Sequence, residues 1–210
     1  MEKPDLRKTA LYEKHLELGA KMVDYSGFEM PVSYDGLKVE HASVREKVGM
    51  FDVSHMGEFT IKGEDALEVL QNITTNDVSK LNDGKIQYSC IPNGKGGIVD
   101  DLLIYRMSEE NYMLVVNASN MDKDWDFISH KIKDGAYNVT FENKSDGLAL
   151  IALQGPNATD ALSPLMIVNP GDLAYYTFIS AEILGVECIV SATGYTGAGG
   201  YELYIPVEHS

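Results

Sequence analysis

Cysteine is scarce in this chain, and several other features are missing altogether. The 210 residues include two cysteines, Cys90 and Cys188, which are too few for a disulfide framework or for the paired ligands of a zinc site. No stretch approaches about 18 consecutive apolar residues, which excludes a membrane-spanning helix. The first ten residues mix both charge signs around no apolar core, unlike a secretory signal or a transit peptide. We therefore expect a soluble protein of the reducing cytoplasm.

Basic residues are also few, and they are unevenly distributed. The chain has 17 Lys and Arg against 32 Asp and Glu, so the net charge of −15 argues against nucleic acid as a partner. No Lys or Arg lies beyond Lys144. An anion bound by the residues after Lys144 would need backbone amides or a segment outside this sequence. An anionic partner would have to be attracted by a local basic patch.

The remaining composition is that of an ordinary globular protein, with 44% apolar and 23% charged residues and no detectable repeat. Hydrophobic periodicity predicts a strand through Phe59 and Ile61 that ends at Gly63. Further strands are predicted over 86–91, 98–106, 111–117, 137–142, 147–154, 176–182, 186–192 and 201–205. Helices are predicted over 9–19, 38–48, 64–73, 119–133 and 157–163.

The order of these elements predicts an α+β protein of mostly antiparallel sheets. Residues 56–142 follow the pattern β-α-β-β-β-α-β, which resembles a ferredoxin-like fold with an added strand. We expect residues 55–142 to be inserted as one α+β domain. The flanking segments, 1–54 and 143–210, are then expected to pack together as a discontinuous, sheet-rich domain.

Two patterns suggest catalysis and are set aside. Ser54 and His55 could be a nucleophile and its base, but in a strand adjacent side chains point to opposite faces. The five histidines are scattered, without the i, i+4 spacing of a metal-binding helix, so we expect no metal site.

Two glycine clusters lie between predicted strands rather than before a helix. The cluster at 94–97 is predicted to connect a hairpin, because glycine supplies positive φ. The cluster at 193–200 is either a wide hairpin or a loop that brings its backbone and Glu202 close to a ligand.

The adjacent acids Asp100 and Asp101 open a predicted strand, so their side chains must point to opposite faces. One face then carries Asp101, Leu103 and Tyr105, and the other carries Asp100, Leu102 and Ile104. Both faces are mostly apolar, so at least one carboxylate lies beside a buried surface. It is either a strand-end acid that caps a neighbouring turn or a site acid at a pocket wall.

Several distinctive motifs occur in order along the chain, among them VGMFDVSHMGEF, GGIVDDLLIYR, LVVNASN and TGYTGAGGYEL. Together they resemble the aminomethyltransferase (T-protein) family of the glycine cleavage system. The resemblance runs from about Thr9 to the last residue, and its segments are 11–34, 48–59, 74–81, 96–106, 114–120, 152–158 and 193–203.

The resemblance implies a folate enzyme. Such an enzyme takes the aminomethyl group from the lipoyl arm of H-protein and passes its carbon to tetrahydrofolate, with release of ammonia. It implies that Asp101 holds the attacking amine of folate and stabilises the iminium character that develops. The implied folate contacts are Tyr88, Leu103, Tyr105, Asn117, Tyr175 and Glu202, with Tyr175 and Glu202 at the pterin ring. No membrane or nucleic-acid partner is expected.

Two departures from the family leave alternatives open. Position 198 is Ala where many relatives have Glu, and the sequence stops at Ser210, before the relatives' third domain and its folate-binding arginine. The sequence is therefore expected to be a fragment or one product of a split gene. The alternatives are another folate-dependent demethylase, such as the folate domain of sarcosine-type oxidases, a non-catalytic folate-binding assembly factor, and an inactive fragment.

Overall fold

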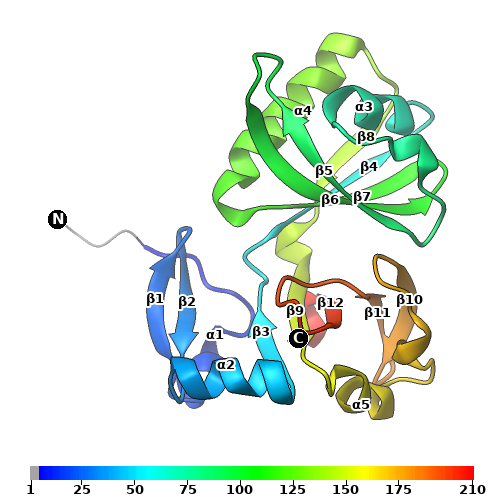
Figure 1. Ribbon diagram of the computed structural model, residues 1–210. Helices are drawn as coiled ribbons and strands as arrows, with labels where there is room; N and C mark the ends of the chain where they lie inside the picture. The colour runs from blue at the N-terminus through cyan, green and yellow to red at the C-terminus, as the bar shows by residue number, and fades with distance from the viewer. Residues whose placement is uncertain (1–4) are drawn as a thin grey trace. The chain divides into compact units, whose positions relative to one another are not determined.

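The computed structural model describes residues 5–210, which divide into two compact units (Figure 1). Unit 1 contains residues 5–55, 147–175 and 179–210. Unit 2 contains residues 56–146 and 176–178. Each unit is described by itself.

Unit 2 is built on a five-stranded sheet in the order β5-β6-β7-β4-β8, in which every neighbouring pair is antiparallel. Its strands are β4 (Gly57–Lys62), β5 (Ile86–Pro92), β6 (Ile98–Ser108), β7 (Asn111–Val116) and β8 (Thr140–Asn143). Its helices are α3 (Ala66–Ile73) and α4 (Met121–Gly135), with 3-10 turns η1 (Val78–Lys80), η2 (Ala118–Asn120) and η3 (Ser145–Gly147). The predicted α+β class with antiparallel sheets is confirmed.

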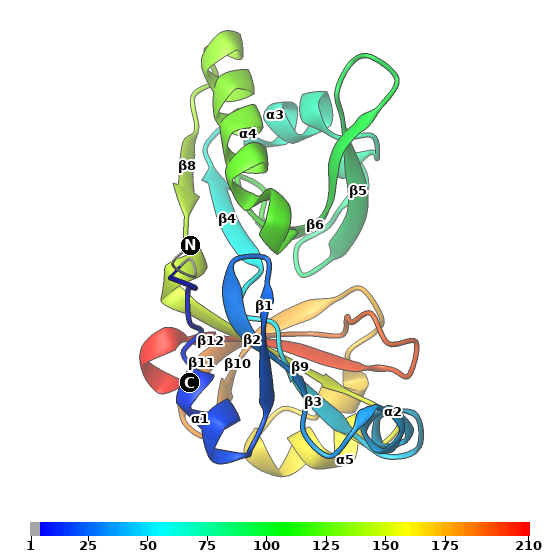
Figure 2. The ribbon, with the colours of Figure 1, turned by 90° about the vertical axis from the view of Figure 1, so that its left-hand side faces the viewer.

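Strand alternation explains why the two faces of this sheet differ. Phe59, Ile61, Leu102 and Ile104 are at most 3% exposed and pack under α3 and α4, which cover one face (Figure 1, Figure 2). The other face of β6 carries Asp101, Leu103 and Tyr105, so the predicted division of side chains is correct. The strand therefore has one core face and one face that is available for a site.

The 94–97 cluster connects β5 to β6, as predicted. Gly94 and Gly96 have φ of 72° and 86°, which glycine adopts without strain. Asn93 Oδ1 accepts hydrogen bonds from the backbone N–H of Lys95 (2.8 Å) and Gly97 (3.0 Å). These bonds fix the register that places Cys90 opposite Asp101.

Unit 1 contains a sheet in the order β10-β11-β12-β9-β3 and a separate hairpin, β1-β2. The sheet strands are β3 (Gly49–Asp52), β9 (Leu148–Gln154), β10 (Phe178–Ile183), β11 (Val186–Ser191) and β12 (Gly200–Pro206). The hairpin strands are β1 (Lys21–Tyr25) and β2 (Phe28–Ser33). The helices are α1 (Tyr12–Glu17), α2 (Leu37–Glu46) and α5 (Ala158–Leu162), with 3-10 turns η4 (Ser163–Leu165), η5 (Pro170–Asp172) and η6 (Val207–His209).

The β1-β2 hairpin and β3 were not predicted. The hairpin turns at Ser26 and Gly27, whose φ values of 53° and 80° suit the two-residue turn that matches strand twist. The expectation that Ser54 and His55 lie in a strand is wrong, because β3 ends at Asp52 and both residues lie in a turn. Ser54 Oγ donates to Leu150 O (3.3 Å), and His55 packs against the rings of Tyr25 and Phe28.

No helix in residues 5–210 is both long and apolar enough to cross a membrane.

Candidate functional site

The Asp101 carboxylate lies on the open face of β6 and is held by two side chains from neighbouring strands. Tyr88 Oη, on β5, donates to Asp101 Oδ2 (2.6 Å). Asn117 Nδ2, just after β7, donates to Asp101 Oδ1 (2.6 Å). We call Tyr88, Asp101 and Asn117 the Asp101 cluster. The structure thus brings together three of the predicted site residues.

Each oxygen of Asp101 accepts one side-chain hydrogen bond and keeps lone pairs for a further donor. Asp101 is half-buried and Tyr88 is 48% exposed, so a ligand can reach both. The hydrogen bond to Asp101 is the main cause that raises the pKa of Tyr88, so its hydroxyl stays a donor at neutral pH. The cluster therefore presents an oriented carboxylate to the outside of the sheet.

Leu103 and Tyr105 continue the same face of β6 in different environments. Leu103 is half-buried and lies opposite Tyr88 in the strand register. Tyr105 is 0% exposed, and its ring packs against Phe178 with centroids 5.2 Å apart. Leu103 can line a ligand surface, whereas Tyr105 supports that surface from inside.

Asp100 points to the helix-covered face, where it meets Asp124 of α4. Burial acts to raise the pKa of Asp100, but hydrogen bonds from Asp124, Asn117 and Asn120 outweigh it and lower the pKa. Asp124 is 0% exposed, and burial, followed by the neighbouring Asp100, raises its pKa to about 8. Asp124 is therefore largely protonated at pH 7. Sequence reasoning missed Asp124, although this acid interrupts the apolar stripe of Trp125 and Ile128.

The two predicted pterin contacts, Tyr175 and Glu202, lie in unit 1. Tyr175 is 72% exposed. Glu202 lies on β12 and accepts a hydrogen bond from Thr193 Oγ1. Burial raises the pKa of Glu202, and the bond from Thr193 opposes this shift.

The glycine-rich loop 193–200 joins β11 to β12 and is held by hydrogen bonds to the side chain of Gln154. Gln154 Nε2 donates to the carbonyls of Thr193 (3.0 Å) and Tyr201 (3.1 Å), and its Oε1 accepts from Thr196 Oγ1 (2.9 Å). Gly194 has φ of 146°, and a Cβ there would overlap the Gln154 amide. Ala198 N donates to Thr196 Oγ1 (3.3 Å), so the loop closes on itself with alanine at this position.

A second aspartate, Asp52 at the end of β3, has a fully buried side chain in unit 1. Its Oδ2 accepts from Thr9 Oγ1 (2.6 Å) and hydrogen-bonds His15 Nε2 (2.8 Å), and its Oδ1 accepts from Ser54 N (2.9 Å). His15 Nδ1 in turn hydrogen-bonds Tyr34 Oη (2.8 Å). Burial acts to raise the pKa of Asp52, but these hydrogen bonds outweigh it and lower the pKa. We call Thr9, His15, Tyr34, Asp52 and Ser54 the Asp52 network.

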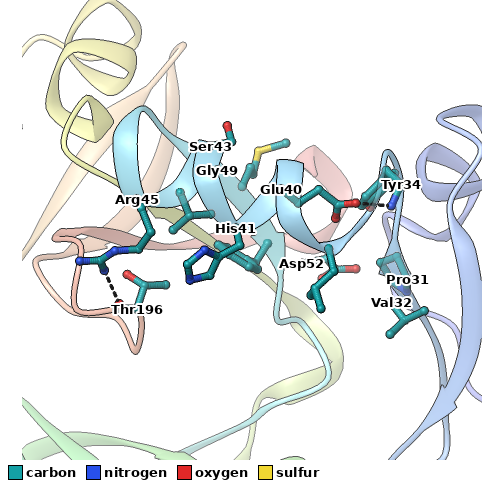
Figure 3. Close-up of a pocket in the computed structure, with 14 residues that line it drawn as sticks. Pro31, Val32, Tyr34, Glu40, His41, Ser43, Arg45, Gly49, Asp52 and Thr196 are labelled. Atoms are coloured by element: carbon teal, nitrogen blue, oxygen red, sulfur yellow. Dashed lines mark hydrogen bonds between the residues drawn. The ribbon is translucent and has the colours of Figure 1, made fainter.

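A cavity of about 480 Å³ lies beside this network in unit 1 (Figure 3). Two of its charged groups are engaged within the protein: Arg45 donates to Thr196 O (3.0 Å), and Glu40 accepts from Tyr34 N (2.8 Å) and Gly36 N (2.7 Å). The lining residues lie between Pro31 and Asp52, with Thr196 added from the loop 193–200: Pro31, Val32, Tyr34, Leu37, Glu40, His41, Ser43, Val44, Arg45, Gly49, Met50, Phe51, Asp52 and Thr196. Local spacing carries no signal of such a cavity, and the sequence analysis missed it.

Within residues 5–210, no three His, Cys, Asp or Glu side chains are grouped so that they could hold a metal ion.

Residues 11–210 match the GCVT N-terminal domain family. The chain belongs to this family. Curated relatives include an aminomethyltransferase of Flavobacterium psychrophilum, 52% identical over 97% of this chain, and one of Chloroherpeton thalassium, 51% identical over 98%. The predicted resemblance is thereby confirmed.

Solved structures agree with this assignment. The glycine cleavage system aminomethyltransferase T from Bartonella henselae is 30% identical and covers 98% of this chain, with a TM-score of 0.90. The heterotetrameric sarcosine oxidase from Corynebacterium is 12% identical with a TM-score of 0.60, which shows a similar fold alone. This GCVT-family chain spans about half of its relatives: 56% of the Flavobacterium protein and 55% of the Bartonella chain.

Proposed function

We propose that this chain is the tetrahydrofolate-binding portion of an aminomethyltransferase of the glycine cleavage system. The reaction takes the one-carbon unit of the S-aminomethyl-dihydrolipoyl group on H-protein and transfers it to tetrahydrofolate. Ammonia is released, and the dihydrolipoyl thiol is restored. The single observation that carries the proposal is the Asp101 carboxylate, oriented by Tyr88 and Asn117 on an open sheet face.

The Asp101 cluster suits this chemistry in two ways. A carboxylate with free lone pairs can accept a hydrogen bond from the attacking amine of folate and hold it in line with the carbon that it attacks. The same negative charge stabilises the cationic iminium character that develops at that carbon. Because Tyr88 and Asn117 fix the carboxylate beforehand, little reorganisation is required as charge develops.

The other predicted residues are assigned to binding rather than to chemistry. Leu103 supplies apolar contact to the folate, and Tyr105 supports that surface. Tyr175 and Glu202 of unit 1 are proposed to contact the pterin ring, where the half-buried Glu202 carboxylate suits the ring's N–H donors. We also propose that 1–54 with 143–210 form one discontinuous domain, with 55–142 inserted.

H-protein is proposed to bind through local basic groups, because the net charge of −15 disfavours a general attraction for an acidic carrier. Lys21 and Lys38 of unit 1 are exposed and are the positions we select.

Folate binding is tested by alkylation of Cys90, whose Sγ lies 4.0 Å from Tyr88 Oη. Tetrahydrofolate on the Asp101 cluster is expected to slow alkylation of Cys90. Cys188, 3% exposed, is an internal control that stays unreactive as long as the protein is folded. An unchanged rate for Cys90 at saturating tetrahydrofolate, together with no heat of binding in calorimetry, would contradict the proposal.

Transfer is tested with aminomethylated H-protein and tetrahydrofolate, using this chain alone and joined to the remaining part of a relative. The expected products are methylenetetrahydrofolate and ammonia. Absence of methylenetetrahydrofolate and ammonia with the joined chain, at saturating concentrations of both substrates, would contradict the proposed transfer.

A further inference from the structure

Asp124 is a buried acid that the proposed transfer does not use. It belongs to the face of α4 that packs on the sheet, together with Met121 and Ile128, and it is 0% exposed. A carboxyl group in such a place is costly unless it is hydrogen-bonded. The group that hydrogen-bonds to Asp124 should therefore explain why an acid is found at this position.

The partner of Asp124 is Asp100 of β6, with which it shares a side-chain hydrogen bond. Among the described residues, no ordinary donor reaches either oxygen of Asp124 or Oδ2 of Asp100. Two ionised carboxylates cannot be neighbours in such a buried place, because like charges repel strongly there. One proton held between them satisfies both groups, as a hydrogen bond from Asp124 to Asp100.

Asn117 connects this pair to the open face of the sheet. Its Nδ2 donates to Asp100 Oδ1 (3.1 Å) and to Asp101 Oδ1 (2.6 Å). The Asn117 amide therefore bonds to one carboxylate on each face of β6. An ionised Asp100 is a stronger acceptor for the Asn117 amide than a protonated one. The proton on Asp124 lets Asp100 stay ionised.

We propose that Asp124 is a positioning residue. Its carboxyl proton holds Asp100, Asp100 in turn holds the Asn117 amide, and the Asn117 amide orients the Asp101 carboxylate. The contribution to transfer rests on the proposed function, whereas the hydrogen-bond chain itself does not. A purely structural acid would fill the same space without linking its proton to Asn117.

The groups that face Asp124 favour its protonated form. Burial, Asp100 on the same face of β6, and the charge of Asp101 on the opposite face together raise the pKa of Asp124 to about 8. Lys123 of the same helix opposes this shift, but its ammonium donates to Val99 O (2.6 Å). From the β7-α4 connection, Asn117 and Asn120 present neutral amides to Asp100. The proton on Asp124 should therefore dissociate only above neutral pH.

The Asn117 side-chain amide reports on this chain of bonds in the ¹⁵N-labelled 210-residue protein. Between about pH 6 and about pH 9.5, its NMR shifts are expected to titrate with a midpoint near 8. Asp124→Asn keeps a donor toward Asp100 but has no proton to lose, so the titration is expected to vanish. Asp126→Asn, an exposed neighbour on α4, is the matched control and should retain it.

Two outcomes would overturn the proposal. One is an Asn117 amide that does not shift over this range in the wild-type protein. The other is an unchanged titration in Asp124→Asn. The infrared band of a protonated carboxyl group at pH 7 gives a check on the wild-type protein that does not depend on the variant folding, and its absence would also contradict the proposal.

These measurements use no folate or H-protein, so they separate this inference from the proposed function. If the titration is found while transfer is absent, the hydrogen-bond chain stands and the proposed function fails. If both are found, wild-type transfer is expected to fall above about pH 8, and Asp124→Asn is expected to be insensitive to pH there.

Discussion

Asp52 of unit 1 and Asp101 of unit 2 are both aspartates held by several hydrogen bonds, yet their surroundings differ. The Asp52 side chain is 0% exposed and is enclosed by Thr9, His15 and Ser54. Asp101 has one side-chain donor on each oxygen and faces the open side of its sheet. Hydrogen bonding alone therefore does not separate the buried Asp52 from Asp101, the proposed site acid. What separates them is whether a lone pair remains that a ligand can reach.

The largest expected effect concerns stability in unit 1. Asp52→Ala leaves the buried groups of Thr9 and His15 without their acceptor, so the free energy of unfolding should fall by about 3 kcal/mol or more. Asp101→Ala should lower it by less than about 1 kcal/mol, because its partners can bond to water. Denaturant unfolding of the two variants checks this. Equal losses would remove the distinction between the two acids.

A smaller effect is expected when one support of Asp101 is removed. Tyr88→Phe deletes the donor to Asp101 Oδ2 and keeps the ring, so transfer should fall about 10-fold, which corresponds to about 1.4 kcal/mol. Tyr34→Phe removes the corresponding hydroxyl from the Asp52 network and should leave transfer unchanged. Kinetics of both variants at saturating tetrahydrofolate test the assignment, and a larger loss in Tyr34→Phe would reverse it.

The pH dependence of stability should also single out Asp52. Its pKa is lowered in the folded protein, so its contribution to stability is present above the usual aspartate value of 3.8 and is lost as pH falls through the folded value. The stability advantage of the wild-type protein over Asp52→Asn should therefore shrink from pH 7 to about pH 3. Thermal unfolding of both proteins at both pH values measures this difference in stability. An advantage that grows on acidification would contradict the assigned direction.

The smallest effect concerns the proposed binding of H-protein to unit 1. Lys38→Glu in unit 1 should slow association a few-fold at low ionic strength and less at high ionic strength, because salt screens exposed charges. Lys133→Glu, an exposed position on α4 of unit 2, is the matched control. An equal effect of both substitutions would show that only net charge matters.

The sequence was sufficient for the elements of unit 2 and for the facing of β6. Along β6, burial alternates from Asp100 to Ile104, and that period of two can be seen in the sequence without tertiary information. The β1-β2 hairpin was missed because Pro31 and the polar residues around Ser26 obscure the alternation. Its signal was local nonetheless, in the Ser-Gly pair at the turn.

The candidate site was less accessible to the sequence. The motifs identified Asp101, Tyr88 and Asn117, but nothing in them distinguished Tyr105, which is buried, from an open ligand contact. His15 and Asp52 meet across a sequence separation of 37 residues, and Asp124 reaches Asp100 from another element. Such pairs depend on tertiary packing, which local spacing does not encode.

The most direct test of the role of Asp101 is the rate of one-carbon transfer by Asp101→Asn, a change that keeps the shape of the side chain and removes its charge. It is measured with the chain joined to the remaining part of a relative, and folding is verified by denaturant unfolding. We predict that transfer falls by about 10²-fold or more, equivalent to about 2.7 kcal/mol, while affinity for tetrahydrofolate changes much less. The exposed substitution Asp160→Asn should leave both unchanged. Transfer by folded Asp101→Asn at the wild-type rate would contradict the account.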